Sequence, residues 1–148
     1  MRPITVLALT GVLATVAAVP RPVPIQDPEE AGIRAALEHY LQGHATGDGA
    51  HMRIAFHPAA ELYWIAGDTL ARRTSEAYAG GFTGRPADDE AQRSRRIVSI
   101  ERAGNAAIGK IELNYPSGRI VDYMSLLKIG SEWKIVNKIF YREPKPEP

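Results

Sequence analysis

The chain has 148 residues, a length that suits one domain. It contains no cysteine, which excludes a disulfide framework and a lipid attached through cysteine. Lys and Arg number 18 against 17 Asp and Glu, and loss of Arg2 with a leader would lower 18 to 17 and balance the two. A balanced domain gives no electrostatic reason to bind nucleic acid or an anionic membrane.

The first 18 residues are typical of a signal peptide. Arg2 supplies a positive start, residues 4–19 form an apolar run, and residues 16–18 are small enough for cleavage. The apolar run is shorter than the roughly 20 residues that a membrane span needs, although an uncleaved anchor stays as an alternative. We therefore expect an exported protein, periplasmic or secreted, with no membrane contact after cleavage. Residues 19–28 are rich in proline and predict an extended tether, and residues 143–148 predict a fraying tail.

Helical signals begin after the tether. Asp27, Pro28 and Glu30 fit the cap, first position and capping box of a helix that ends near residues 47–49. Its apolar side carries Ile33, Leu37, Tyr40, Leu41 and His44. Short helices are predicted over residues 50–56 and after a Thr74 or Ser75 cap. Between them, residues 61–65 and 69–72 predict a small hairpin.

Four long apolar runs close the chain, over residues 96–102, 106–115, 119–129 and 133–141. Short turn signals separate them, a pattern typical of an antiparallel meander. Helices followed by a meander predict an α+β domain in which one curved sheet wraps around a helix and leaves a cavity.

Several motifs in this order resemble the nuclear transport factor 2-like (NTF2-like) superfamily. They are Tyr40-Leu41-x6-Asp48, Phe56-His57-Pro58-x-Ala60, Ile97-x-x-Ile100, Asp122-Tyr123-x-x-Leu126-Leu127-Lys128 and Trp133-Lys134-Ile135-Val136-Asn137-Lys138-x-Phe140. The chain is most similar to the superfamily's putative lumazine-binding branch. The resemblance implies a cone-shaped α+β domain over residues 29–142, with a pocket between curved sheet and helices. It implies much less about activity, since the superfamily holds enzymes, binders and assembly modules.

The segment from Tyr40 to Gly67 also resembles the ketosteroid isomerases of that superfamily. Those enzymes use a tyrosine and a protonated aspartic acid as an oxyanion hole and an aspartate as the general base. Tyr40 fills the tyrosine position, but the base position is Trp64 and the second acid position is Ser125. Isomerase chemistry is therefore not expected to be inherited.

Side chains alternate across a strand, so each of the last two strands has two candidate inner faces. The less charged one carries Tyr123, Ser125, Leu127, Trp133, Ile135, Asn137 and Ile139. A three-residue turn at residues 130–132 would join these sets, and we expect them to line the cavity. The other face would then be convex, with Leu126, Val136 and Phe140 in a homodimer contact and Asp122 and Lys138 in an exposed cross-strand ion pair.

The predicted ligand contacts are Tyr40, Trp64, Tyr123, Ser125 and Asn137. Each has a structural alternative, in which the aromatic rings are core and the polar groups satisfy one another or a water. His44, one turn beyond Tyr40, and His57, before Pro58, are the candidate proton carriers. Either histidine could instead be a hydrogen-bonded structural residue. No histidine spacing matches a metal site, and no cofactor is predicted.

The preferred hypothesis is that this exported domain binds a small, mostly apolar or aromatic molecule. One alternative is a cofactor-independent lyase, isomerase or hydratase in which His44 or His57 moves a proton and Tyr40 stabilises negative charge. Another is a dimeric structural or assembly module. Because no clear acid–base pair is visible, the sequence favours binding over catalysis.

Overall fold

A computed structural model describes residues 27–144 of the chain, with side chains through residue 143. The predicted signal peptide and most of the predicted tether lie outside the described residues. Helix α1 spans Pro28–Thr46, α2 Gly49–Ala55 and α3 Ser75–Ala79, and a 3-10 turn covers Glu90–Gln92. The strands are β1 (Phe56–Ala66), β2 (Thr69–Thr74), β3 (Ser94–Ala103), β4 (Ala106–Tyr115), β5 (Gly118–Ile129) and β6 (Glu132–Pro144). The expected helices, hairpin and meander are all confirmed, although β1 and β6 are longer than predicted.

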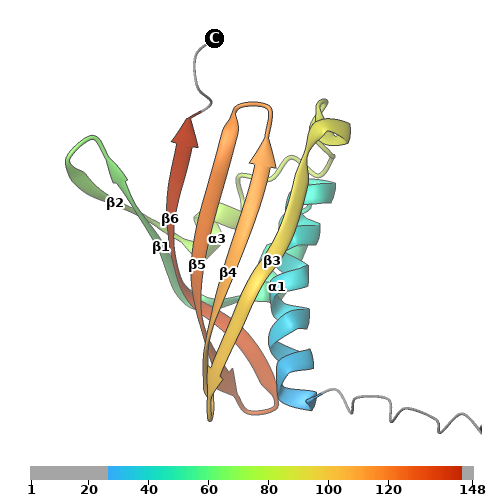
Figure 1. The fold of residues 1–148 in the computed structure, drawn as a ribbon, viewed down its shortest axis with the longest axis vertical. Helices are drawn as coiled ribbons and strands as arrows, with labels where there is room; N and C mark the ends of the chain where they lie inside the picture. The colour runs from blue at the N-terminus through green and yellow to red at the C-terminus, as the bar shows by residue number, and fades with distance from the viewer. Residues whose placement is uncertain (1–26, 145–148) are drawn as a thin grey trace, which may run out of the picture.

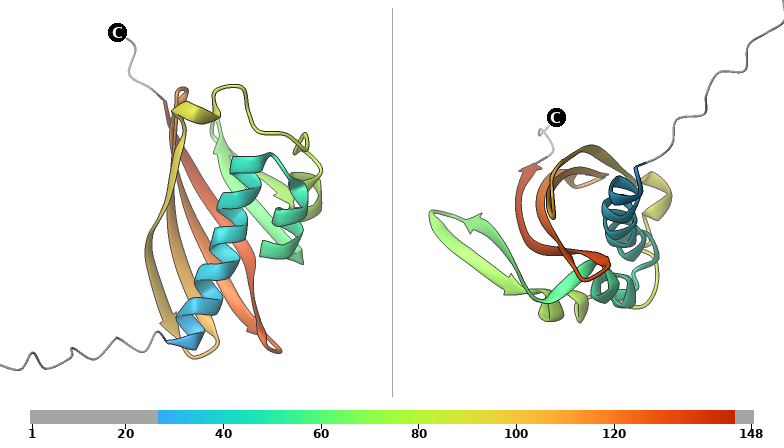
Figure 2. Two further views of the ribbon diagram at one scale, coloured as in Figure 1. Left: turned by 90° about the vertical axis from the view of Figure 1, so that its right-hand side faces the viewer. Right: turned by 90° about the horizontal axis from the view of Figure 1, so that it is seen from below.

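All six strands form one sheet in the order β2-β1-β6-β5-β4-β3 (Figure 1). Neighbours are antiparallel except β1 and β6, which run parallel. The sheet curls around α1, while α2 and α3 cover the side nearer β1 (Figure 2). The α+β NTF2-like fold is therefore confirmed. No helix within residues 27–144 combines the length and apolar character that crossing a bilayer requires.

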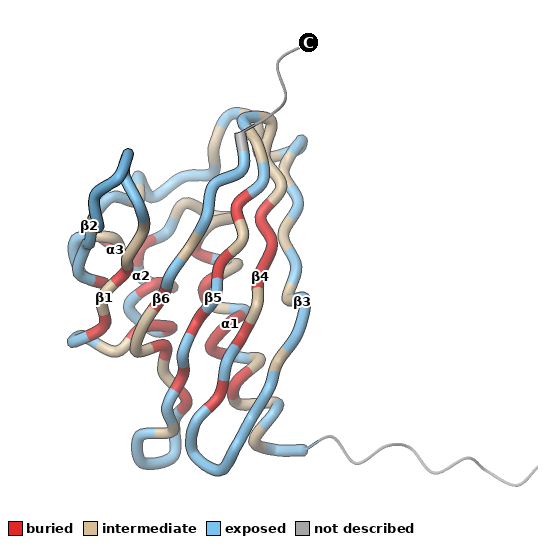
Figure 3. Tube along the Cα trace, turned by 60° about the vertical axis from the view of Figure 1, so that its left-hand side comes forward, coloured by how far each residue is buried: buried red, intermediate tan, exposed pale blue. Residues whose placement is uncertain are grey.

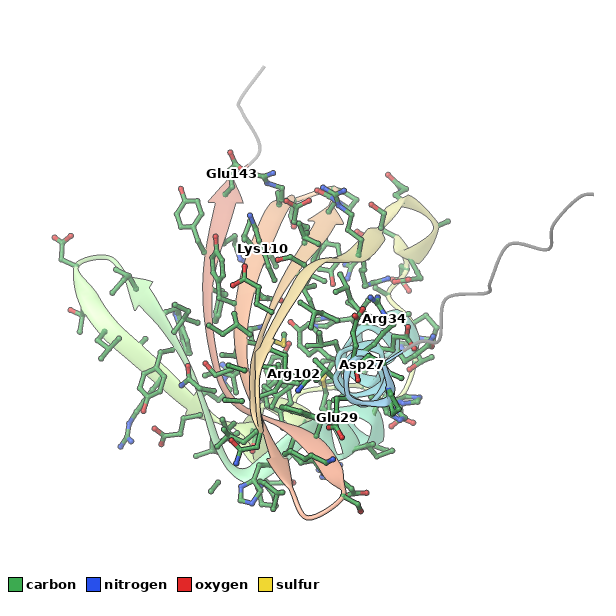
Figure 4. The ribbon with its side chains drawn as sticks, turned by 60° about the horizontal axis from the view of Figure 1, so that its bottom comes forward. Asp27, Glu29, Arg34, Arg102, Lys110 and Glu143 are labelled. Carbon is green, nitrogen blue, oxygen red and sulfur yellow. The ribbon has the colours of Figure 1, made fainter. Side chains whose placement is uncertain are left out.

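The start of α1 is tied to the sheet by charged side chains that gather at one end of the cone (Figure 4). Asp27 caps the helix by accepting from the Glu29 backbone N–H at 2.9 Å, and it pairs with Arg102 of β3 at 2.9 Å. The Glu29 carboxylate accepts from Lys128 Nζ at 2.5 Å and from Trp133 Nε1 at 2.9 Å. These contacts fix the helix against both edges of the meander.

The core lies between α1 and the concave face of the sheet (Figure 3). It contains Ile33, Leu37 and Tyr40 of α1 and is completed by Met52, Phe56, Leu62, Ile111, Leu113, Met124, Leu126, Trp133 and Ile135. On β5 the buried positions are even-numbered, from Ile120 to Leu126. Tyr123 and Leu127 are instead 44% and 41% exposed.

The predicted inner face of β5 is therefore wrong. The prediction places the less charged face inside, but the interior accepts Asp122 because Lys138 neutralises it there. The prediction for β6 is right at Trp133 and Ile135 and wrong beyond them.

A bulge on β6 explains that change of face. Leu126 pairs with Ile135, whereas Ser125 pairs with Asn137, so Val136 is an extra residue with no partner on β5. The residues after the bulge reverse their orientation, which turns Lys138 inward and leaves Ile139 half-exposed. The hairpin loop is also shorter than expected, because Ile129 already pairs with Glu132.

Candidate functional site

A pocket of about 980 Å³ opens on the concave side of the sheet. α1, the β1–β2 hairpin, α3 and strands β4–β6 all contribute to its wall. The aromatic lining residues are Tyr40, His44, Trp64, Tyr78, Tyr115, Phe140 and Tyr141. A volume of that size accommodates a drug-sized molecule, and a mainly aromatic wall with a few polar groups is the usual composition of a ligand site.

Three polar side chains meet at the floor of the pocket. The Tyr40 hydroxyl donates to Asp122 Oδ2 at 2.6 Å and accepts from Lys138 Nζ at 2.6 Å. Lys138 Nζ also lies 3.0 Å from Asp122 Oδ1. Tyr40 and Asp122 are fully buried and Lys138 is 3% exposed. The exposed ion pair predicted for Asp122 and Lys138 is thus a buried one, although it does join neighbouring strands, where Asp122 pairs with Phe140.

Asp122 has one unsatisfied oxygen. Oδ1 makes no hydrogen bond of acceptable geometry within the described residues, although the Lys138 ammonium lies close to it. Lys138 Nζ lies among aromatic rings, 4.8 Å from the ring centroids of Tyr40 and Phe140 and 5.2 Å from that of Tyr78. Such rings stabilise a desolvated cation.

The electrostatics of the floor keep Lys138 charged and Tyr40 neutral. Burial alone lowers the pKa of Lys138, but Tyr78 and the Asp122 carboxylate outweigh it, so the pKa lies above its ordinary value. Burial raises the pKa of Tyr40 well above its ordinary value, and the Asp122 carboxylate adds to that effect. The floor therefore presents a fixed ammonium group beside a protonated phenol.

His44 forms one wall of the pocket between two tyrosine hydroxyls. Its Nε2 lies 2.8 Å from the Tyr78 hydroxyl and its Nδ1 lies 3.1 Å from the Tyr115 hydroxyl. Burial lowers the pKa of His44 well below its ordinary value, and the nearby cations Lys138 and Arg95 lower it further. The imidazole is therefore neutral at pH 7, with one ring nitrogen a donor and the other an acceptor.

The second candidate histidine lies elsewhere. His57 is at the start of β1, where its Nδ1 accepts from the Ala59 backbone N–H at 3.1 Å. It does not line the pocket. Its observed role is this local hydrogen bond, which fits the structural alternative expected for it.

Trp64 and Phe140 form a stacked pair on the hairpin side of the pocket. Their ring centroids are 5.5 Å apart and their planes differ by 28°. Both rings line the pocket, and Trp64 is only partly buried. Each ring also has a cation over it, because the Arg73 guanidinium carbon lies 5.9 Å from the Trp64 centroid and Lys138 Nζ lies 4.8 Å from the Phe140 centroid.

Of the predicted ligand contacts, the structure brings Tyr40 and Trp64 into the pocket, together with His44. Tyr123 and Ser125 lie on the outer face of β5, and the Asn137 side chain donates to the Glu61 backbone carbonyl at 3.3 Å. The predicted placement of these three in the cavity is therefore wrong, because the inner face of β5 is the even-numbered one and the bulge reverses β6 before Asn137. Leu126 and Phe140, assigned to a convex dimer contact, face inward for the same reason.

Sequence reasoning missed Asp122 beneath the pocket floor and most of the lining, including Lys138, Tyr78 and Tyr115. A local pattern could have indicated the first two, because Asp122 shares a strand face with Met124 and Leu126. A charged residue among aliphatic residues on one face of a strand is typical of a buried ion pair. Nothing local marks the two tyrosines, which reach the pocket from α3 and β4. Within residues 27–144, no group of three or more His, Cys, Asp or Glu side chains is placed to hold a metal ion.

Comparisons with known proteins agree with this geometry. The profile of the family described as "Putative lumazine-binding" matches residues 28–141, which include the helices, the sheet and the pocket. The chain belongs to this family. No curated protein matches the sequence significantly.

Among solved structures, an NTF2-like protein of unknown function from Shewanella baltica OS155 is similar with a TM-score of 0.71 at 24% identity. That alignment covers 84% of this chain and 100% of the other. An NTF2-like protein of unknown function from Methylobacillus flagellatus KT aligns with a TM-score of 0.67 at 28% identity, covering 82% and 97% of the two chains. A third NTF2-like protein of unknown function, from Silicibacter pomeroyi DSS-3, aligns with a TM-score of 0.68 at 19% identity. That alignment covers 78% of this chain and 97% of the other. These structures share the fold and, by their descriptions, name no ligand.

Proposed function

We propose that this member of the putative lumazine-binding family binds a small, planar, mostly aromatic molecule in the pocket above Lys138. The observation that carries the proposal is the Trp64–Phe140 stack, which borders an open space of about 980 Å³. Burial of the ligand's apolar surface against these rings would supply most of the affinity. The Lys138 ammonium and the hydroxyls of Tyr78 and Tyr115 would orient it.

The test uses the two tryptophans of the chain. Trp64 lines the pocket, whereas Trp133 is buried at the start of β6 and bonded to Glu29. In a Trp133→Phe variant, fluorescence reports Trp64 alone. A panel of planar heteroaromatic and steroid-like compounds should contain members that quench this emission and raise the melting temperature. Trp64→Ala should weaken the binding of those compounds. A panel that produces neither quenching nor a higher melting temperature would overturn the proposal.

A second candidate function is cofactor-independent catalysis by a lyase, isomerase or hydratase. It is favoured by a neutral His44 in the wall and a charged Lys138 on the floor of one pocket. His44 would take a proton from a carbon next to a carbonyl group, and Lys138 would stabilise the negative charge that develops on oxygen. His57, outside the pocket, has no part in this candidate.

Hydrogen exchange tests catalysis separately from binding. A bound carbonyl compound incubated in D₂O should gain deuterium next to its carbonyl group, as detected by NMR. His44→Gln should abolish that gain, while His57→Gln should leave it unchanged. Binding without any exchange across the carbonyl compounds of the panel would remove this candidate and leave the binding role intact.

Dimerisation through the outer face of the sheet is also proposed, with residues different from those first expected. Ile108, Tyr123 and Ile139 are 54%, 44% and 52% exposed on that face, and Tyr123 pairs directly with Ile139. Exposed apolar side chains on adjacent strands fit a contact with a second copy. Light scattering should show a dimer that Tyr123→Glu converts to a monomer, and a wild-type monomer at high concentration would contradict it.

Export of the protein is likewise a proposal, supported by the sequence pattern of residues 1–18. Mass measurement of the protein from a cell envelope fraction should show cleavage near residue 18.

A further inference from the structure

The charges around the pocket are unbalanced. Every charged side chain that lines it is a cation, namely Arg73, Arg93, Lys138 and Arg142. No carboxylate lines the pocket within the described residues. A solvated surface usually mixes both signs, so this arrangement raises the local positive potential.

Two of these cations are neutralised by neighbours behind the wall. Lys138 Nζ lies 3.0 Å from Asp122 Oδ1, and Arg93 Nε lies 2.7 Å from Asp89 Oδ1. Arg73 and Arg142 differ, because neither has a carboxylate oxygen within 4.0 Å in the part of the chain that the structure describes. Among the described residues, the uncompensated positive charge of the pocket therefore belongs to these two arginines.

Both arginines border the stacked aromatic pair. The Arg73 guanidinium carbon lies 5.9 Å from the centroid of the Trp64 ring. Arg142 follows Phe140 by two residues on β6, so the two side chains share a face of that strand. A molecule packed beside the Trp64–Phe140 pair would therefore meet the Arg73 guanidinium, which lies over the Trp64 ring.

We infer that the ligand of this pocket is a planar aromatic anion, whose ring packs on Trp64 and Phe140 and whose carboxylate is held by Arg73 and Arg142. This inference rests on the proposed binding function and names the chemical class of the ligand. Guanidinium groups bind carboxylates through paired N–H donors and also pack on aromatic faces. Both arginines are exposed, so their attraction for a carboxylate should be screened by salt.

The test compares two molecules of nearly equal shape that differ in charge. 2-Naphthoate carries a carboxylate, and 2-naphthamide replaces it by a neutral amide. Titration of the full chain should show at least about tenfold tighter binding of the naphthoate, and the difference should shrink as salt rises from about 20 to 500 mM. The double variant Arg73→Gln/Arg142→Gln should lose about tenfold in affinity for naphthoate and little for naphthamide.

A control variant has the same net charge change away from the pocket. Arg34 lies on α1, where it pairs with Glu30, and Arg72 is the neighbour of Arg73 on β2 but pairs with Glu61. Arg34→Gln/Arg72→Gln should bind both compounds as the wild type does.

The possible results distinguish a failure of the anion inference from a failure of the proposed binding function on which it rests. Equal affinities for the two compounds, or loss of naphthoate binding in the control variant to the same extent, would overturn the anion inference. If neutral compounds still quench Trp64 in that case, the pocket remains a binding site. If no compound of either charge binds, the proposed function fails as well.

Discussion

Lys138 Nζ and Asp122 Oδ1 lie 3.0 Å apart at the floor of a pocket, with both side chains withdrawn from water. A buried pair of this kind contributes little net stability, but each partner alone is strongly unfavourable. The pair places one ammonium group in a fixed position beneath an aromatic cavity.

Removing one partner of this pair should destabilise the protein more than removing both. Lys138→Met leaves the Asp122 carboxylate buried without a counter-charge, and we expect a loss of about 3–5 kcal/mol in the free energy of unfolding. Asp122→Leu combined with Lys138→Met should recover much of that loss. Urea denaturation of the three proteins measures both values, and a double variant that is no more stable than Lys138→Met would contradict the prediction.

The Tyr40 hydroxyl should contribute more to stability than an exposed tyrosine hydroxyl. Tyr40→Phe removes the 2.6 Å bond to Asp122 and leaves a buried carboxylate oxygen without a donor. We expect a loss of about 1–3 kcal/mol. Tyr141→Phe is the matched control, because Tyr141 is 64% exposed, and it should change the free energy of unfolding by less than about 0.5 kcal/mol.

Stability should also fall in alkaline solution. The folded-state pKa values of both Lys138 and Tyr40 lie above their ordinary values, so above about pH 10 the unfolded chain releases protons that the folded chain retains. Their contribution is complete below that pH and is lost as the pH rises. Denaturation between pH 8 and 11 should show the decline, and Tyr40→Phe should show a shallower one. Equal slopes would place the effect on other groups.

His44 should make the protein less stable in mild acid. Its folded-state pKa lies well below 6.5, so below about pH 6.5 the unfolded chain binds a proton that the folded chain does not. The stability lost should approach about 1.4 kcal/mol per pH unit between pH 6.5 and 5, before most carboxylates titrate. His44→Gln should flatten this part of the profile, while His57→Gln should preserve it. An unchanged slope in His44→Gln would contradict the assignment.

Two glycines with similar backbones should respond differently to alanine. Gly47 at the end of α1 and Gly104 in the β3–β4 turn both have positive φ, 69° and 59°. A Cβ at Gly47 would lie 1.8 Å from the Arg85 carbonyl oxygen, whereas one at Gly104 meets nothing within 4 Å. Gly104→Ala should lower the free energy of unfolding by about 1–2 kcal/mol through backbone strain alone. Gly47→Ala should lose clearly more, and equal melting temperatures would contradict the close approach of Arg85.

The sequence predicted the architecture because that information is local. Proline and aspartate mark the start of α1, and short turn signals separate the meander strands. The expected three-residue turn implies a register in which Asp122 lies opposite Phe140, and that pair is observed although the turn itself differs. A two-residue loop followed by the extra residue Val136 gives the same register as the expected three-residue turn.

The orientation of the strands could not be predicted in the same way. Alternation gives each strand two faces but does not say which one is inside, and on β5 both faces carry large apolar side chains. The choice depends on a contact across the sheet, where Lys138 neutralises Asp122. It also depends on the bulge at Val136, which the presence of a valine does not predict. Tyr78 and Tyr115 join the pocket only through the tertiary fold, so no spacing in the chain relates them to His44.

The order of the strands constrains when this domain can fold during its synthesis. β6, the last of the described strands, lies between β1 and β5, and β1 has no other neighbour in the sheet except β2. While the ribosome is still making residues 132–144, the early hairpin has no sheet to join and its inner side chains stay exposed. The ligand cavity therefore cannot exist on the nascent chain until its final strand has emerged. A chain that stops before β6 would present two additional unpaired edges, on β1 and β5, to any chaperone or protease nearby.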